Sequence, residues 1–162
     1  MLEQNRALWD QLLIHRGLAA LARAEELSHA LSSFGTYTLQ AAIAARHARA
    51  ITAAATDWPR IAALYSALAH VAPSPIVELN RAVAVSMAEG PAAGLAILDA
   101  IADDPALKNY HLLPSVRADL LRKLGRLDQA RAEFTRAATL TQNSRERDLL
   151  LSRAASCIAK SN

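Results

Sequence analysis

A short segment in the last third of the chain constrains the fold most, because it contains a complete helix reversal. Gly125 follows a leucine-rich stretch and permits the left-handed backbone at which one helix ends and the chain turns back. After this turn, Ala130, Phe134 and Ala137 are spaced by four and then three residues, so they share one face of a helix. Alanine at the first of these positions lets two helices approach closely. Residues 124–137 therefore predict the turn and second helix of an antiparallel helical hairpin.

The same spacing occurs twice more, upstream of this segment. The triplet at 130, 134 and 137 aligns with residues 36 positions earlier, and again with residues a further 33 positions earlier. The aligned residues are Gly94, Leu98 and Ile101, then Ile61, Tyr65 and Leu68. These offsets are close to the period of about 34 residues that characterises tetratricopeptide repeats. We predict an all-α fold, a tetratricopeptide-like right-handed superhelix of antiparallel helical hairpins with a C-terminal capping helix.

Proline, glycine and capping residues divide the chain into the expected helices. No period-two apolar alternation occurs, so no sheet is predicted. Asp57 and Ser74 are expected to cap helices that have Pro59 and Pro75 in their first turns, and Thr36 to cap another after a turn at 33–36. The expected helices are 5–32 with Gly17 as a potential break, 37–54, 57–71, 75–88, 91–102, 111–124, 127–141 and 144–159.

These elements are expected to form a single helical-repeat domain over residues 1–162. An N-terminal helical segment, 1–35, precedes repeats at 36–73, 74–107 and 108–142, and a capping helix spans 143–162. On the capping helix we expect one face to pack inward and the charged residues 145–148 to face solvent. The inward residues are predicted to be Leu149, Leu150, Ala154, Ala155 and Ile158, with Cys157 as a buried structural thiol.

Composition limits the function classes. Hydrophobic residues make up 52% of the chain and charged residues 20%, which excludes a disordered chain. No apolar run has transmembrane length and no signal peptide opens the chain, so we expect no membrane partner. The single cysteine excludes an internal disulfide and indicates a cytoplasmic location.

Charge is distributed unevenly. Residues 108–162 carry 11 Lys/Arg against 5 Asp/Glu, whereas residues 1–107 carry 7 against 10. A basic third of this kind could contact nucleic acid or an acidic protein surface. The interpretation that we prefer is a set of solvated arginines on helix exteriors.

No residue pattern predicts catalysis. The five histidines are never paired at i,i+4, and the chain has no HExxH motif, glycine-rich phosphate loop or GxSxG motif. We predict a protein that is not an enzyme and that binds no metal and no cofactor.

Several polar and aromatic residues are candidates for a partner-binding groove. Asn80 and Arg81 lie within an otherwise apolar helical segment, where buried polar groups need partners. One interpretation is that Asn80 bonds the backbone of the Pro73–Ser74 turn, which we prefer; the other is that the pair lines a groove. The candidate groove residues are Gln40, His47, Trp58, Asn80 and Arg81.

Taken in order, several of these motifs give the chain a likeness to a known family. It resembles the C-terminal tetratricopeptide-like extension of bacterial extracytoplasmic-function sigma factors, over essentially its whole length. Asn5 replaces an aspartate of the family's opening motif, which weakens the expectation of a charged contact near residues 5–8. The segments that carry the resemblance are 5–10 with Gly17, 37–45 with His47 and Ala48, 56–58, 74–84, 90–96 and 124–126.

The resemblance implies a regulatory interaction domain of a transcription initiation factor. We expect its partner to be the sigma regions of the same polypeptide, RNA polymerase or a cognate regulator. The promoter-reading sigma regions are absent from these residues, so we expect the chain to be a C-terminal fragment that reaches promoter DNA only through those upstream regions. The alternatives are a ligand-sensing domain with a groove at Gln40, His47, Asn80 and Arg81, a tetratricopeptide scaffold outside transcription, and a homodimer through exposed groove surface.

Overall fold

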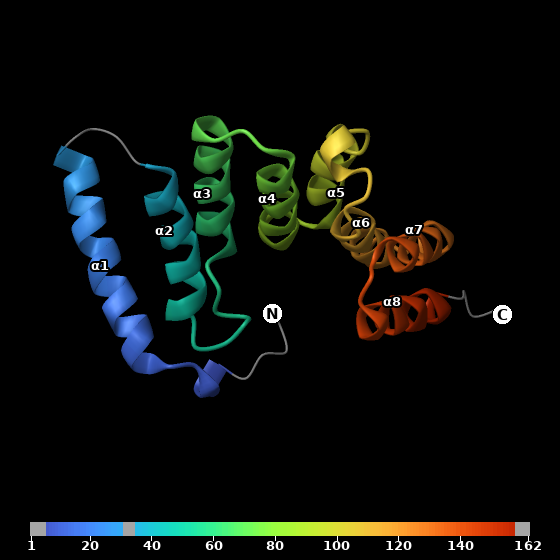
Figure 1. Cartoon of the computed structure of the whole chain (residues 1–162), viewed down its shortest axis with the longest axis horizontal. Coiled ribbons are helices and arrows are strands. Elements are labelled where there is room, and N and C mark those ends of the chain that lie inside the picture. The colour runs from blue at the N-terminus through green and yellow to red at the C-terminus, as the bar shows by residue number, and fades with distance from the viewer. Residues whose placement is uncertain (1–5, 31–34, 158–162) are drawn as a thin grey trace. The chain divides into compact units, whose positions relative to one another are not determined.

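The computed structural model describes residues 6–30 and 35–157, apart from the side chains of Ala7, His29 and Ala30. Every regular element within these ranges is helical, which confirms the predicted all-α class (Figure 1). Asn5, the Ser33–Phe34 turn and Ile158 lie outside the described residues. The elements are η1 Arg6–Leu8, α1 Gln11–Ala30, α2 Thr36–Arg49, α3 Trp58–Val71, α4 Pro75–Ala88, α5 Pro91–Ala100, η2 Pro105–Leu107, α6 Leu112–Lys123, α7 Leu127–Leu140 and α8 Ser144–Ser156.

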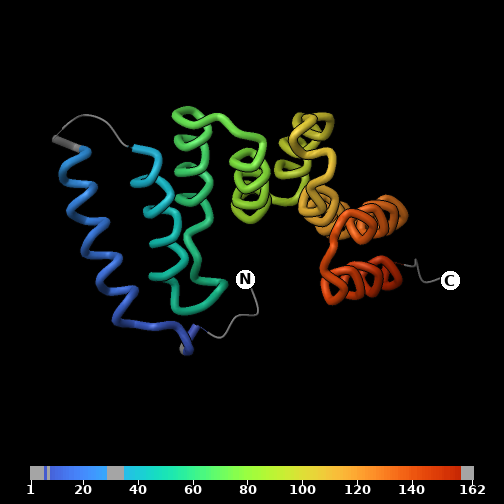
Figure 2. The backbone as a smooth tube through the Cα atoms, in the orientation of Figure 1, coloured from blue at the N-terminus to red at the C-terminus, as the bar shows by residue number. Residues whose placement is uncertain are grey.

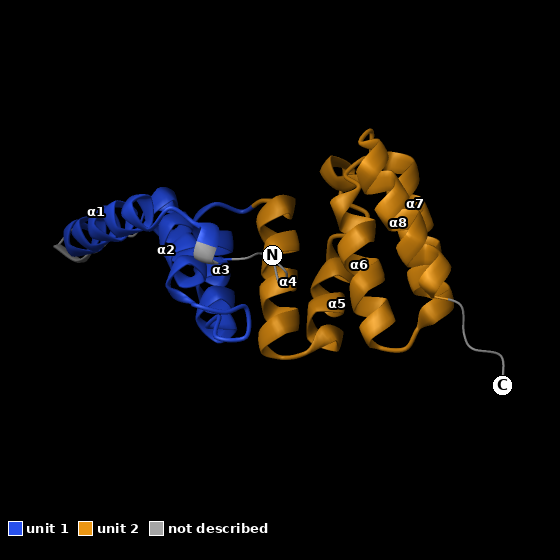
Figure 3. Ribbon diagram, turned by 90° about the horizontal axis from the view of Figure 1, so that it is seen from below, with its two compact units in different colours: residues 1–73 blue, residues 74–162 orange. Residues whose placement is uncertain are grey.

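The chain divides into two compact units, Met1–Pro73 and Ser74–Asn162 (Figure 3). Their boundary coincides with the predicted boundary between the first two repeats. In unit 1, α2 packs against both α1 and α3 (Figure 2). The small core of this unit joins Leu21 of α1 to Ala42 and Ala45 of α2.

Unit 2 has the larger core. Within it α4 packs on α5, α6 on α7 and α8 on α7, and α5 also contacts α6. Phe134, Leu98, Leu107 and Leu121 are among its fully buried side chains. These pairs place consecutive helices side by side.

The reversal that the sequence predicts at Gly125 is present. Gly125 has a φ of 75°, so it adopts the left-handed conformation that favours glycine. Ala130, Phe134 and Ala137 are all completely buried, as is Leu98 at the aligned position of α5. The spacing of 36 residues therefore marks equivalent buried positions at Gly94 and Leu98, whereas Ile101 is half-buried and lies just after α5.

Two predicted helix starts are confirmed. The Asp57 carboxylate accepts a hydrogen bond from the Arg60 backbone N–H, and the Ser74 hydroxyl accepts one from Ile76. Pro59 and Pro75 lie in the first turns of these helices, where no backbone donor is needed.

Three predicted details of unit 1 are wrong. Gly17 lies inside α1, and the break comes earlier, after η1, where the Asp10 carboxylate accepts a hydrogen bond from the Leu13 N–H and starts the helix. Gly35, not Thr36, is the N-cap of α2. The helix also stops at Arg49, five residues early, because Ala50 adopts an extended conformation.

The capping helix α8 uses a narrower inward face than predicted. Leu150, Ala154 and Cys157 are buried because they recur at i, i+4 and i+7, whereas Leu149 and Ala155 are exposed. Burial of Cys157 is confirmed. On the expected solvent face, Arg145, Arg147 and Asp148 are exposed, whereas Glu146 is half-buried and accepts a hydrogen bond from Thr141 at the end of α7.

Gly94 lets α4 and α5 approach more closely than any larger residue would permit. A methyl group added at its Cα would lie 2.6 Å from the Ala82 carbonyl oxygen and 2.6 Å from the Ser86 Cβ. Both neighbours belong to α4, and one is backbone, so neither can move aside without shifting the helix.

We predict that Gly94→Ala lowers the stability of unit 2 by about 1–3 kcal/mol, since the helices must separate. Gly17→Ala is the control: Gly17 is helical with no atom nearby, so alanine there should stabilise α1 by about 0.4–1 kcal/mol. Native-state hydrogen exchange measures both effects within their own units. Equal effects of the two substitutions would contradict the close approach.

Candidate functional site

Arg6 connects the start of the chain to the end of α2. Its Nη1 donates to the carbonyl oxygens of His47 at 3.1 Å and Ala50 at 2.6 Å, and its Nη2 donates to the Thr56 hydroxyl at 3.2 Å. The last carbonyls of a helix have no partner within the helix, and a cation there also interacts favourably with the helix dipole. Arg6 therefore caps α2 and fixes the loop that leads to α3.

Aromatic rings surround this cap. The Arg6 Cζ lies 5.3 Å from the centroid of the Trp9 ring, a cation–π distance. The His47 ring contacts Trp58 edge-on, with centroids 5.3 Å apart and planes at 73°. Segments 6–9, 47–50 and 56–58, which are distant in sequence, thus meet at one end of α2.

Burial lowers the pKa of His47 below its usual value, and the nearby positive charge of Arg6 lowers it further. The ring is therefore neutral at pH 7. His47 contacts Trp58, and Arg6 makes three hydrogen bonds to protein oxygens, so the arrangement is suited to holding the structure together rather than to proton transfer.

The candidate groove residues are distributed over both units. In unit 1, His47 and Trp58 are in contact, whereas Gln40 is exposed on α2. In unit 2, Asn80 is exposed on α4 and Arg81 forms an ion pair with Glu78 at 2.7 Å. The structure thus brings two pairs together: His47 with Trp58, and Arg81 with a residue of its own helix.

The preferred structural role for Asn80 is wrong. Its side chain is exposed and makes no hydrogen bond to the turn at Pro73–Ser74, where Ser74 caps the helix itself. Being solvated, Asn80 does not need the internal partner that we expected from its apolar neighbours.

Several arginines in the last third of the chain form ion pairs or hydrogen bonds within unit 2. Arg117 forms ion pairs with Asp99 and with Glu133, Arg122 and Arg153 pair with Asp119, and Arg136 pairs with Glu133. Arg147 donates to the carbonyl oxygens of Ala138 and Thr141 at the end of α7. These contacts favour arginines that stabilise helix packing over a stripe of cations that tracks phosphates.

A further network joins α8 to the rest of unit 2. Glu146 accepts a hydrogen bond from the Thr141 hydroxyl at 2.6 Å and lies 3.1 Å from the His111 ring nitrogen. The hydrogen bond from Thr141 is the main cause of a lowered pKa at Glu146, and the charge of His111 adds to it. Glu146 is therefore ionised at neutral pH.

Helix α1 exposes three leucines on the side that its packing in unit 1 leaves free. Its inner face buries Leu21 and Ser28. On the other side, Leu12, Leu13 and Leu27 are exposed by 60%, 63% and 65%, and at about 100° per residue they lie within a quarter to a third of a turn of one another. We call these three side chains the leucine face of α1. Leu27 lies about 21 Å along the helix from Leu13, and Arg16 and Arg23 are exposed on the same side between them, so apolar and basic side chains alternate along this surface.

Among residues 6–30 and 35–157, no three His, Cys, Asp or Glu side chains lie close enough together to hold a metal ion. None of the helices in these ranges is long and apolar enough to cross a membrane.

The sequence did not reveal the role of Arg6. We expected charged contacts near residues 5–8 to be weakened, yet Arg6 makes three hydrogen bonds. Its partners lie more than 40 positions away, so only the spacing of Arg6 and Trp9, three residues apart before a helix start, gives a local signal.

Comparison with known proteins gives one informative relative. The chain is 44% identical over 144 residues to an uncharacterized protein of Rhizobium meliloti (strain 1021), a match that covers 89% of this chain and 33% of that protein. The chain thus spans about a third of the length of the curated relative it matches. No family model and no solved structure matches it.

We predict that Arg6→Gln destabilises the end of α2 by about 1–3 kcal/mol, because the part-buried carbonyl oxygens of His47 and Ala50 lose a charged donor. Amide exchange of residues 46–50 measures this loss. Arg16→Gln is the control, since Arg16 is exposed on α1. Similar exchange rates in both variants would show that Arg6 is not the cap.

A pH dependence follows from His47. Its pKa is 6.5 when unperturbed and lower when folded, so the unfolded chain binds more protons between these values and stability falls as the pH drops below about 6.5. NMR titration should show a lowered His47 pKa that rises in Arg6→Gln but stays below 6.5, since burial persists. An unchanged pKa in the variant would contradict the contribution of Arg6.

Proposed function

We propose that residues 1–162 are a regulatory protein-interaction domain of a bacterial extracytoplasmic-function sigma factor, acting in the cytoplasm during transcription initiation. The ordered motifs from 5–10 to 124–126 support this proposal. The 44%-identical relative is about three times the length of the matched region, which is consistent with a place for this segment in a longer polypeptide. In this proposal the helical pairs form a tetratricopeptide-like superhelix, and the sigma regions belong to the same longer polypeptide.

The observation that carries the proposal is the leucine face of α1. Three leucines, each at least 60% exposed, lie on a helix whose other side is already packed. Leaving such a surface in water is unfavourable by about 25 cal/mol for each square ångström, so a protein partner that covers it gains affinity. We propose that the sigma regions bind this face and that the contact tunes promoter engagement.

The test introduces positive charge into this face in the longer polypeptide. We expect Leu13→Lys combined with Leu27→Lys to change promoter-dependent transcription as much as deletion of residues 1–162 does, because lysine cannot be buried there without a partner. Transcription in vitro with purified RNA polymerase measures the effect.

Leu149→Lys in α8 is the matched control, since Leu149 is 52% exposed but lies in unit 2. It should leave transcription unchanged. The proposal fails if deletion of residues 1–162 has no effect, if the native reading frame encodes no sigma regions, or if the control is as damaging as the α1 variant.

A further inference from the structure

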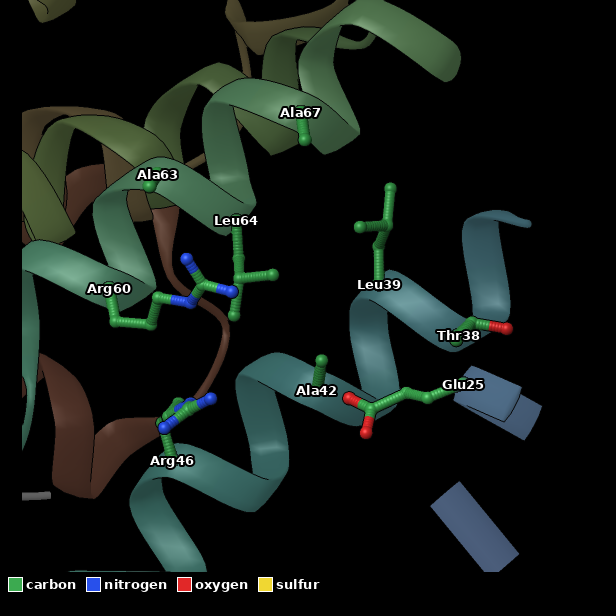
Figure 4. Close-up of a pocket in the computed structure, with 9 residues that line it drawn as sticks. All are labelled: Glu25, Thr38, Leu39, Ala42, Arg46, Arg60, Ala63, Leu64 and Ala67. Carbon is green, nitrogen blue, oxygen red and sulfur yellow. The ribbon is translucent and has the colours of Figure 1, made fainter. Parts of the chain in front are cut away.

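Unit 1 contains a pocket of about 490 Å³ among α1, α2 and α3 (Figure 4). A volume of this size accommodates a small organic molecule. Its polar lining comes from Glu25 of α1, Thr38 and Arg46 of α2, and Arg60 of α3. None of these residues is in the groove that the sequence suggested.

Arg46 has an unmet hydrogen-bonding requirement. Its Nε is buried, yet no acceptor lies within hydrogen-bonding distance among the described residues. A buried charged donor without an acceptor is strongly unfavourable, and native structures usually supply such a group with a protein partner, a water or a bound ion. Arg46 as a whole is half-buried and lines the pocket, so an acceptor bound there would meet the rest of its guanidinium group.

The charge around Arg46 favours a singly charged anion. Arg60 lies on the same side of the pocket and, like Arg46, forms no ion pair with a described carboxylate (Figure 4). Glu25 enters from α1, so two positive charges and one negative charge surround the space. A guanidinium group binds a carboxylate through parallel hydrogen bonds, and Glu25 opposes a second negative charge on the ligand.

The rest of the pocket is apolar. Leu39 and Leu64 extend into it from α2 and α3, and Ala42, Ala63 and Ala67 complete the wall. Alanine leaves room that a larger side chain would fill. This surface would contact a hydrocarbon body and would offer nothing to a free inorganic anion.

We propose that this pocket binds a small monocarboxylate with an apolar body. The carboxylate binds Arg46, with Arg60 adding a second positive charge, and the hydrocarbon lies against Leu39, Leu64 and the alanines. This function goes beyond the proposed interaction with sigma regions and stands independently of it, because every lining residue belongs to unit 1 and none to the leucine face.

Octanoate is the probe, used with the complete chain of residues 1–162. Isothermal titration calorimetry should show saturable binding at one site, with NMR shifts of the Ala42 and Ala67 methyl groups and of the Arg46 Nε–H. Arg46→Gln should weaken binding by about tenfold or more, the effect of losing a charged hydrogen bond. Arg49→Gln should bind normally, since Arg49 is exposed on the same helix and does not line the pocket.

Two further comparisons test the ligand class. Ala67→Leu fills the apolar part without changing charge and should also weaken octanoate binding, whether or not Arg46→Gln folds. Octylamine and inorganic phosphate should not bind. The proposal is overturned if octanoate does not saturate, if Arg46→Gln and Ala67→Leu both bind like the wild type, or if phosphate binds as tightly as octanoate.

Discussion

Close approach between helices through small residues is the constraint on which this structure depends. The apolar content of the chain is dominated by alanine, so its helices can bury enough surface only by lying near one another. Gly94 shows how closely α4 and α5 approach, because even one methyl group there would lie 2.6 Å from the α4 backbone. Ala118, Ala130 and Ala137 are completely buried, and the larger Phe134 and Leu98 fill the spaces that remain.

Unit 1 has a smaller apolar core than unit 2, and the features for which we propose a function belong to unit 1. Its core is small, so Arg6 supplies an electrostatic cap where apolar packing is sparse. The alanines of α2 and α3 leave the pocket that Arg46 lines, and α1 retains its leucine face. In the account proposed here, the sigma regions cover this face, and the pocket gives a carboxylate access to the same unit.

Local signals predicted the elements, whereas long-range contacts determined the candidate site. Asp57, Ser74 and Gly125 each act within a few residues, so their roles could be inferred from the sequence. The Arg6 cap and the Arg46 pocket could not, since their partners come from other helices. The sequence predicts a potential helix break at Gly17, but this residue lies within α1, because a helix tolerates glycine at modest cost. The tetratricopeptide-like superhelix and the relation to sigma factors stay predictions.

The most direct test of the central claim compares hydrogen–deuterium exchange of α1 in two proteins. One is residues 1–162 alone, and the other is the longer polypeptide in which we propose that sigma regions precede them. If those regions cover the leucine face, the amides of Gln11–Ala30 exchange more slowly in the longer protein, while those of Leu127–Leu140 in α7 are unchanged. Equal exchange of α1 in both proteins would contradict the account.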